Sequence, residues 1–174
     1  MTVKKIPPTP CLLFLSVFFR SDLLDKKRLQ DFVDAWSMNH PGVVAQTKTL
    51  ISYYQKEMGL SENYQRLFFF SKKTFSRDIL IDFKDACIDF EVQNSKDLHR
   101  TANLDPGILC LEHFILATTK PYAHRPHLGR SIYSELVYLF EKGNFRPLPW
   151  AYPDYLEESV IQLFKSQRER LLSP

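Results

Sequence analysis

Glycine is scarce in this sequence: the 174 residues include five glycines, and no two of them lie close together. A phosphate-binding loop of the Gly-x-x-x-x-Gly-Lys-Ser/Thr type and a dinucleotide-binding Gly-x-Gly-x-x-Gly turn both need closely spaced glycines. The Gly-x-Ser-x-Gly turn that carries a nucleophilic serine in many hydrolases is absent for the same reason. The sequence therefore excludes these nucleotide-binding and hydrolase motifs.

Cysteine is also scarce, and Cys11, Cys87 and Cys110 are widely separated in apolar surroundings. An odd number of isolated cysteines does not make a disulfide framework, and none of them stands in a catalytic-cysteine signature. Buried, reduced thiols in a cytosolic protein are the simplest interpretation.

Long hydrophobic runs are missing as well, since the apolar run Cys11–Phe19 is far too short to cross a bilayer. Lys4 and Lys5 precede it as in a signal peptide. However, prolines interrupt the junction, and Arg20–Asp22 stands where the small residues of a cleavage site should be. We therefore expect a cytoplasmic protein without a membrane segment, in which Leu12–Phe19 forms a buried first strand.

The rest of the composition is typical of a folded domain. Hydrophobic residues make up 44% and aromatic residues 14% of the sequence, which excludes a disordered chain. The length fits one domain over residues 1–174, with residues 1–10 as a flexible N-terminal segment. The formal net charge of +3 is mild. A nucleic-acid partner is therefore not favoured, because dedicated nucleic-acid binders usually carry a denser basic stripe.

Hydrophobic periodicity predicts an order of strands and helices. Alternation and β-branched residues predict strands, and apolar residues at helical spacing behind a capping residue predict helices. The expected strands are Leu12–Phe19, Val43–Ile51, Tyr64–Phe70 and Ile132–Phe140, with a Lys142–Asn144 turn leading into Phe145–Trp150. The expected helices begin at Ser21 or Asp22, at Ser76, and at Asp154 with Glu157 completing a capping box, and Tyr53–Met58 forms a short turn or helix.

Two segments are harder to interpret. Ile108–Thr119 alternates like a strand, but its apolar content also suits a helix. Asn103–Gly107 contains Asp-Pro-Gly and is expected to turn, because Asp bonds its own backbone, Pro presets φ and Gly accepts a positive φ. The order of elements predicts a single α+β domain. It would have a ferredoxin-like split βαβ start, a mixed or antiparallel sheet, an added hairpin and a C-terminal helix.

The most informative stretch of the chain is free of acidic residues. Between Glu112 and Glu135, a loop concentrates the side chains of Lys120, His124, Arg125, His127 and Arg130. Arginine pairs with carboxylate or phosphate through two parallel hydrogen bonds, and histidine can exchange a proton near neutral pH. The loop therefore predicts a site for a small anion, and a solvated loop that only keeps the surface soluble is the alternative.

Glu135 and the histidines allow further interpretations. Glu135 lies on a largely apolar face of its expected strand, which suits either a functional carboxylate or a structural ion pair with Arg130 or Arg100. His124-x-x-His127 could bind a metal ion. No further ligand has a diagnostic spacing, and the sequence contains no Cys-x-x-Cys or His-Glu-x-x-His motif. We therefore expect no metal site.

Several spaced motifs are similar to those of one protein family. They are Tyr53–Gly59, Arg100–Gly107, Leu116–Lys120, His124-Arg125, Leu128-Gly129, Ile132–Glu135 and Pro149–Tyr155. Together they resemble an uncharacterised prokaryotic family, domain of unknown function number 4416, over nearly the whole chain. The resemblance implies a small stand-alone cytosolic protein with no established activity. Members are sometimes labelled GTP-binding proteins, but this sequence has no phosphate-binding loop to support that label.

The family's motif residues in this chain are mostly polar, charged or aromatic, which is typical of a site rather than of a core. They are Tyr53, Tyr54, Glu57, Asn103, Asp105, Lys120, His124, Arg125, Glu135 and Asp154. The chain departs from the family pattern at two positions. Ile108 stands where a tyrosine usually follows Asp-Pro-Gly, and Ser52 stands where an aspartate often precedes the tyrosine pair.

The leading functional hypothesis is a site for a small phosphorylated or carboxylated ligand. In an enzyme of this kind, His124 would act as general acid or base, with Glu57 or Glu135 as its orienting or proton-relaying partner. The expected ligand-binding residues are Arg100, Asn103, Asp105, Lys120, Arg125, Arg130, Tyr53 and Tyr54. The sequence implies no particular cofactor or reaction.

Two alternatives belong to other functional classes. The aromatic and proline-rich segment Phe145–Tyr155 could form a protein-interaction surface or a homodimer contact instead of serving an enzyme. Single-stranded nucleic acid could also lie on an aromatic face of the sheet beside the basic loop.

Overall fold

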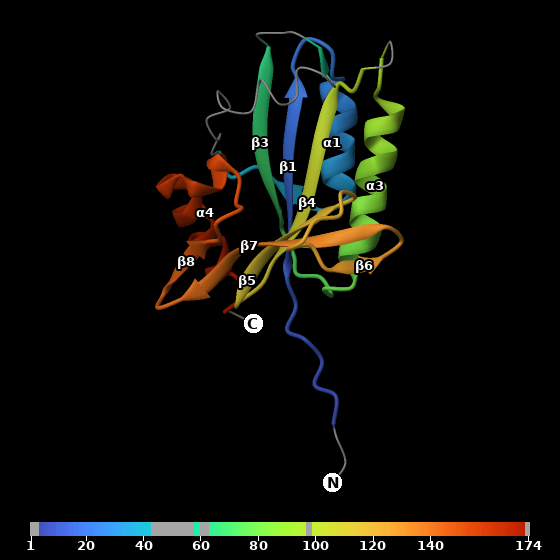
Figure 1. The fold of residues 1–174 in the computed structure, drawn as a ribbon. Helices are drawn as coiled ribbons and strands as arrows, with labels where there is room; N and C mark the ends of the chain where they lie inside the picture. Colours follow the sequence, from blue (N-terminus) through green and yellow to red (C-terminus); the bar gives the residue numbers. More distant parts are fainter. Residues whose placement is uncertain (1–3, 43–57, 60–62, 97–98, 173–174) are drawn as a thin grey trace.

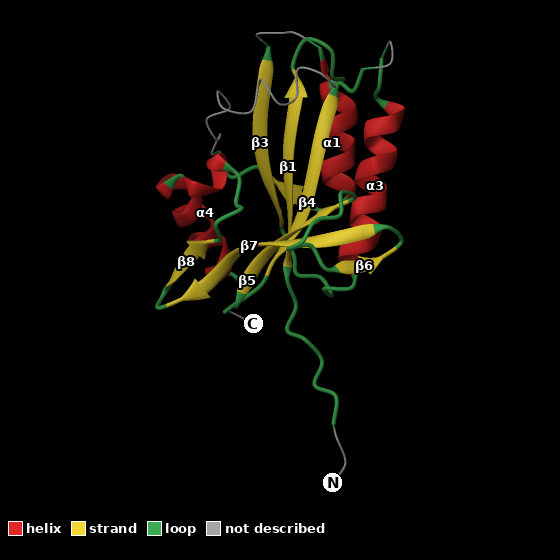
Figure 2. Ribbon diagram, in the orientation of Figure 1, coloured by secondary structure: helices red, strands yellow, loops and turns green. Residues whose placement is uncertain are grey.

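An antiparallel sheet with helices on both faces forms the centre of the molecule (Figures 1 and 2). The computed structural model describes residues 4–42, 58–59, 63–96 and 99–172. In this part of the chain the strands are β1 (Leu12–Arg20), β2 (Met38–Asn39), β3 (Tyr64–Ser71), β4 (Ala102–Leu109), β5 (His113–Thr118), β6 (His127–Gly129), β7 (Ile132–Glu141) and β8 (Asn144–Pro147). The helices are α1 (Lys26–Ala35), α3 (Ile79–Gln93), α4 (Glu158–Glu169) and the 3₁₀ helix η1 (Pro153–Leu156). The predicted α+β class, added hairpin and C-terminal helix are confirmed.

The sheet follows the order β2-β3-β1-β4-β5-β7-β6, and β8 pairs with β7. Helices α1 and α3 cover one face and α4 lies against the other (Figure 1). β7 crosses below β1 and β4 in this view, so the sheet is strongly curled. The strands that follow β4 therefore run across the lower ends of β1 and β4 in this view.

β1 is the central strand of the hydrophobic core. Alternate residues such as Leu13 and Leu15 pack toward α1 and α3, whereas Leu12 and Phe14 pack toward α4. Because both faces of the sheet are covered, this strand is an almost continuous apolar run instead of an alternating one. The core on the α4 side is largely aromatic and includes Phe14, Phe68, Phe70, Phe114, Tyr138, Tyr155 and Phe164. The predicted buried first strand is confirmed.

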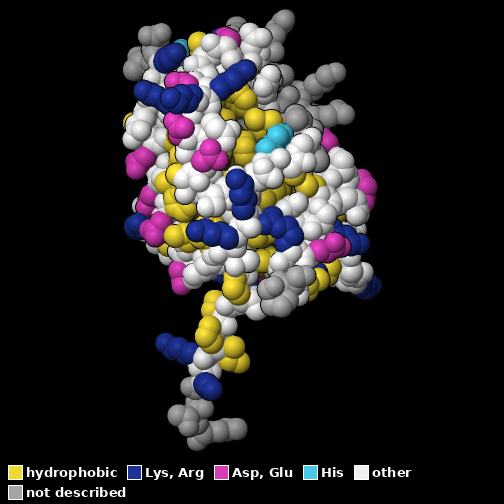
Figure 3. Space-filling view, turned by 180° about the vertical axis from the view of Figure 1, so that it is seen from behind, with side chains coloured by type: hydrophobic (Ala, Val, Ile, Leu, Met, Phe, Trp, Pro, Cys, Tyr) yellow, Lys and Arg dark blue, Asp and Glu magenta, His cyan; other side chains and the backbone are white. Residues whose placement is uncertain are grey.

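The three cysteines are buried and form no disulfide, in agreement with the prediction. Burial raises the pKa of Cys11 to about 11 and that of Cys110 to about 12, which keeps both groups as unreactive thiols. Residues 4–10 are exposed and project from the body of the molecule, with hydrophobic side chains along them (Figure 3). None of the helices in the described ranges is long and apolar enough to cross a membrane.

The first two helices begin later than the sequence predicts. Asp25, not Ser21 or Asp22, caps α1, because its carboxylate accepts hydrogen bonds from the backbone N–H groups of the first turn. Asp22 instead forms an ion pair with Arg20 (2.7 Å). The α3 helix follows Asp78, to which the expected cap, Ser76, donates a side-chain hydrogen bond (3.1 Å).

Asp154 does not open the last helix, so the predicted capping box is wrong. It lies in η1, and α4 begins at Glu158 with no side-chain cap. The Asp154 carboxylate is buried against the guanidinium of Arg66, a residue of β3. Because the Asp154 carboxylate pairs with Arg66 in the interior, it does not cap α4.

The expected turn at Asn103–Gly107 is wrong, because this segment is the middle of β4. An added Cβ at Gly107 would clash with the backbone oxygen of Ile115, so glycine allows β5 to approach closely. β5 pairs with β4 only from Gly107 to Leu109, so Pro106 needs no N–H for that partner. The ambiguous Ile108–Thr119 segment contains the end of β4 and the whole of β5.

The remaining strands agree more closely with the sequence. Tyr64–Phe70 and Ile132–Phe140 are confirmed as strands, each ending one residue later than expected. Lys142 and Gly143 both have positive φ (50° and 82°), as a tight hairpin turn requires, and β8 follows. The expected strand at 43–51, and the expected turn at 53–58 apart from its last residue, lie outside the described residues.

Candidate functional site

β4 and β5 separate at one end, and side chains of α3 fill the gap. β5 pairs only with the last residues of β4, so the backbone of Leu104 meets no strand on that side. Glu91 accepts a hydrogen bond from Leu104 N, and Lys84 Nζ donates one to Leu104 O (3.2 Å). Two charged side chains of a helix therefore satisfy backbone groups that a strand would otherwise satisfy.

A cavity of about 90 Å³ lies at this split. Its walls come from α3, β4, the end of β5 and the segment before η1. It is lined by Lys84, Ile88, Glu91, Arg100, Asn103, Asp105, Thr118, Thr119, Lys120 and Tyr152. The space corresponds to roughly three water molecules, so it fits a phosphate or carboxylate group but not a whole nucleotide.

A chain of polar contacts connects the wall of the cavity. Arg100 donates to Glu91 (3.1 Å) and to the side-chain oxygen of Asn103 (3.2 Å). Asn103 Nδ2 in turn donates to Asp105 Oδ2 (2.8 Å). The order of donors and acceptors fixes the orientation of the Asn103 amide, and it holds these four side chains in one network.

The cavity combines three cationic with two acidic side chains. Glu91 is buried, and this burial raises its pKa to about 7, although the ammonium of Lys84 and the Leu104 N–H both favour the carboxylate. Near neutral pH a fraction of Glu91 is therefore protonated. With all five side chains ionised, the cavity has a net charge of +1 from three cations and two carboxylates. Protonation of Glu91 makes this net charge more positive.

Beside the cavity, a second cluster forms around the buried carboxylate of Glu135. This residue lies on β7 opposite Leu116 of β5 and is 2% exposed. Arg125 Nε donates to its Oε2, and His124 Nε2 lies 3.3 Å from the same oxygen. Arg125 also donates to the backbone carbonyl of Lys120 (3.0 Å), whose side chain lines the cavity. The cluster therefore ties the basic loop to the sheet.

Aromatic side chains fix the imidazole of His124. Its ring stacks on Trp150, with centroids 4.4 Å apart and an interplanar angle of 12°, and meets Tyr122 edge to face. Trp150 is itself held by a hydrogen bond from Nε1 to Leu136 O (2.7 Å). Since Glu135 faces Nε2, the other ring nitrogen is the one that could exchange a proton with a ligand.

The structure brings together most of the residues predicted to form a site. Arg100, Asn103, Asp105 and Lys120 line the cavity, and His124, Arg125 and Glu135 form the adjacent cluster. Tyr53, Tyr54 and Glu57 lie outside the described residues. The described site residues thus come from β4 and the loop before it, from the loop after β5, and from β7.

Arg130 is separated from this group. It lies in the β6–β7 turn with a positive φ of 49°, and it forms ion pairs with Asp82 and Asp85 on the exposed surface of α3. The acid-free run of sequence is therefore not free of acids in space, because the fold places these aspartates and Glu135 against it. Arg130 has a surface ion-pairing role in this structure.

Lys84 and Glu91 also line the cavity, and the sequence did not predict them. They lie seven positions apart on α3, which is two helical turns, so they share one side of the helix. A charged pair at this spacing beside the apolar stripe of Leu80, Phe83 and Cys87 was the available signal. It was weak, because a solvated helix face has the same pattern.

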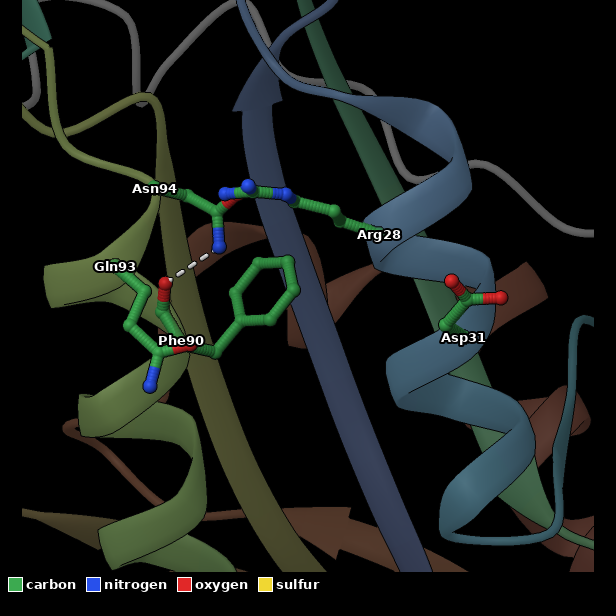
Figure 4. Close-up of a pocket in the computed structure, with 5 residues that line it drawn as sticks. All are labelled: Arg28, Asp31, Phe90, Gln93 and Asn94. Carbon is green, nitrogen blue, oxygen red and sulfur yellow. Dashed lines mark hydrogen bonds between the residues drawn. The ribbon is translucent and has the colours of Figure 1, made fainter.

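A larger hollow of about 580 Å³ lies between α1 and α3 (Figure 4). Arg28 and Asp31 project from α1, while Phe90, Gln93 and Asn94 come from the end of α3. Asn94 donates to Phe90 O (2.8 Å), and the exposed Arg28 reaches toward the Asn94 amide. The contact between Arg28 and Asn94 therefore joins the two helices across this hollow. Across the described ranges, no cluster of three or more His, Cys, Asp or Glu residues could hold a metal ion.

A comparison with protein families agrees with the motifs along the chain. The family described as Domain of unknown function (DUF4416) matches residues 9–171. The chain belongs to this family. The match includes every residue of the cavity and of the cluster around Glu135 in this DUF4416 chain. Searches of curated proteins and of solved structures each found no match.

Proposed function

We propose that the DUF4416 chain binds a small anionic ligand, whose phosphate or carboxylate group enters the cavity between β4 and β5. The observation that carries this proposal is the convergence of Lys84, Arg100 and Lys120 on one small polar space. These cations come from α3, from the loop before β4 and from the loop after β5. An ammonium has three hydrogen-bond donors and a guanidinium five, so each cation can bind more than one acceptor.

The cluster around Glu135 would supply acid–base chemistry if the bound ligand reacts. His124 is the residue that could exchange a proton, and the buried Glu135 carboxylate would orient its ring. Lys120 connects the two parts, because its side chain lines the cavity and its carbonyl accepts a hydrogen bond from Arg125. An enzyme of this design would lose activity in His124→Ala while retaining ligand affinity.

Replacing Lys120 by glutamine is expected to weaken anion binding by roughly ten- to a hundredfold, which is the usual contribution of a charged hydrogen bond. Isothermal titration calorimetry with small phosphates and carboxylates would measure this effect. Arg130→Gln is the matched control, because it also removes one positive charge from the segment between Glu112 and Glu135, but Arg130 forms ion pairs with Asp82 and Asp85. Equal weakening in both variants would show diffuse electrostatic attraction and contradict the proposed site.

An interaction surface is the second candidate, favoured by exposed apolar side chains around the segment Phe145–Tyr155. Tyr122, Trp150, Tyr152 and Leu156 are 68%, 38%, 36% and 53% exposed. In a homodimer through this surface, the molar mass would rise with concentration and Leu156→Lys would abolish the rise. Val92→Lys on α3, where Val92 is 69% exposed, is the control. A constant monomer mass in light scattering would exclude the homodimer.

A further inference from the structure

We infer that the group bound in the cavity is a phosphate that retains a proton, and that the carboxylates of Glu91 and Asp105 select it by accepting this proton in a hydrogen bond. The inference rests on the proposed anion site and narrows its ligand from anions in general to protonated oxyanions. It gives a specific role to the acidic half of the cavity wall.

The carboxylates are difficult to explain in a site for an anion without hydrogen-bond donors. Glu91 and Asp105 line the same cavity of about 90 Å³ as the three cations, so a bound anion cannot avoid them. A carboxylate in the same small cavity repels a bound anion and weakens its binding, unless a proton lies between the two groups. A ligand that carries its own O–H converts this repulsion into a short, charge-assisted hydrogen bond.

Both carboxylates keep the capacity to accept such a bond. Glu91 receives hydrogen bonds from Leu104 N and from Arg100, and Asp105 receives one from Asn103. A carboxylate offers about four lone-pair sites, so these contacts do not saturate it. The same contacts hold both groups in fixed positions, and selection by hydrogen bonding requires fixed acceptors.

The chemistry of common anions then distinguishes the candidates. Inorganic phosphate retains at least one proton throughout the neutral range, whereas sulfate and simple carboxylates retain none. A phosphate monoester loses its last proton with a pKa of about 6. Burial raises the pKa of Glu91 to about 7, so this carboxyl group and a phosphate can share one proton near neutral pH.

The charged groups around Glu91 come from every element that packs against it. Lys84 lies on its own helix, Arg100 precedes β4, Asp105 lies on β4 and Lys120 follows β5. The cations neutralise the negative charge of the ligand, and the Asp105 carboxylate is a second hydrogen-bond acceptor beside Glu91. Above a pH of about 7 Glu91 becomes ionised, and the proton must then come from the ligand.

Calorimetric titration of the whole protein with inorganic phosphate and with sulfate at about pH 8 tests the inference, because the two ions are then matched in shape and charge. Phosphate is expected to bind about tenfold or more tightly than sulfate. Glu91→Gln and Asp105→Asn should each reduce this preference, since an amide N–H can donate to sulfate. Asp82→Asn, an exposed acid on the same helix, should leave the preference unchanged.

Glycerol 3-phosphate distinguishes free phosphate from an esterified one. Its affinity should fall relative to that of inorganic phosphate as the pH rises from about 6 to about 8, because only the ester loses its last proton there. Sulfate binding as tightly as phosphate would overturn the inference and leave the anion site standing. The absence of binding by every one of these anions would overturn the proposed function as well. If Glu91→Gln does not fold, the less buried Asp105→Asn provides the same comparison.

Discussion

Asp154→Ala is expected to lower the free energy of unfolding by about 3–5 kcal/mol, because it leaves a buried guanidinium without its counter-charge. Arg66 and Asp154 are 3% and 1% exposed, and their side chains form an ion pair on the α4 side of the sheet. Such a loss is a large part of the total stability of an ordinary domain. Urea denaturation of the variant and of the wild-type protein, followed by circular dichroism, would measure it.

The surroundings of this pair make its disruption costly. Within the described ranges, Arg66 Nε, Asp154 Oδ1 and the nearby Ser16 Oγ have no hydrogen-bond partner. Burial raises the pKa of Asp154 and the Arg66 guanidinium opposes this rise, so each partner offsets part of the cost of burying the other's charge. Removing one partner therefore exposes the full desolvation cost of the other.

The double variant Arg66→Met/Asp154→Leu is the control for this prediction. Replacing a whole buried ion pair by apolar residues of similar size is often neutral or stabilising, so the double variant should be far more stable than Asp154→Ala. If Asp154→Ala had the same midpoint of urea denaturation as the wild-type protein, the prediction would be contradicted. It would mean that the guanidinium finds water or another partner without cost.

The sequence predicted elements well where one local signal dominates. β1 was recognisable because both of its faces are buried, and the β7–β8 hairpin because Lys142-Gly143-Asn144 suits positive φ values. The prediction failed where a distant partner overrides a local signal. Asp-Pro-Gly has good turn chemistry, yet the close approach of Ile115 O explains why Gly107 is needed inside a strand.

The same contrast applies to the site. The basic loop was visible as a run without acids, and its meeting with Glu135 follows from a strand that returns beside the loop. Lys84 and Glu91 could not be assigned, because their position depends on where β5 leaves β4. No periodic pattern in the sequence marks the residue at which two paired strands separate. Periodicity places a side chain on a face, whereas only the fold shows which backbone gap it fills.

Glu91→Gln is expected to change how the stability of the protein depends on pH. The pKa of Glu91 is about 7 in the folded protein against a reference value of 4.5, so between these values the folded state holds a proton that the unfolded state has released. The contribution of this group to stability is therefore greatest at acidic pH. It falls by up to about 3 kcal/mol as the pH rises from about 4.5 to about 7.

Glutamine removes this titration, so the stability of Glu91→Gln relative to wild type should rise across that window and stay level above and below it. Urea denaturation at a series of pH values measures the difference directly, and other titrating groups cancel in the comparison. Glu112→Gln gives a control of opposite sign. Hydrogen bonding to Arg77 lowers the pKa of Glu112, so wild type should lose stability relative to that variant as the pH falls below about 4.5. A flat difference for Glu91→Gln would show that this carboxyl group titrates normally, and that a proton shared with a bound phosphate must reside on the ligand.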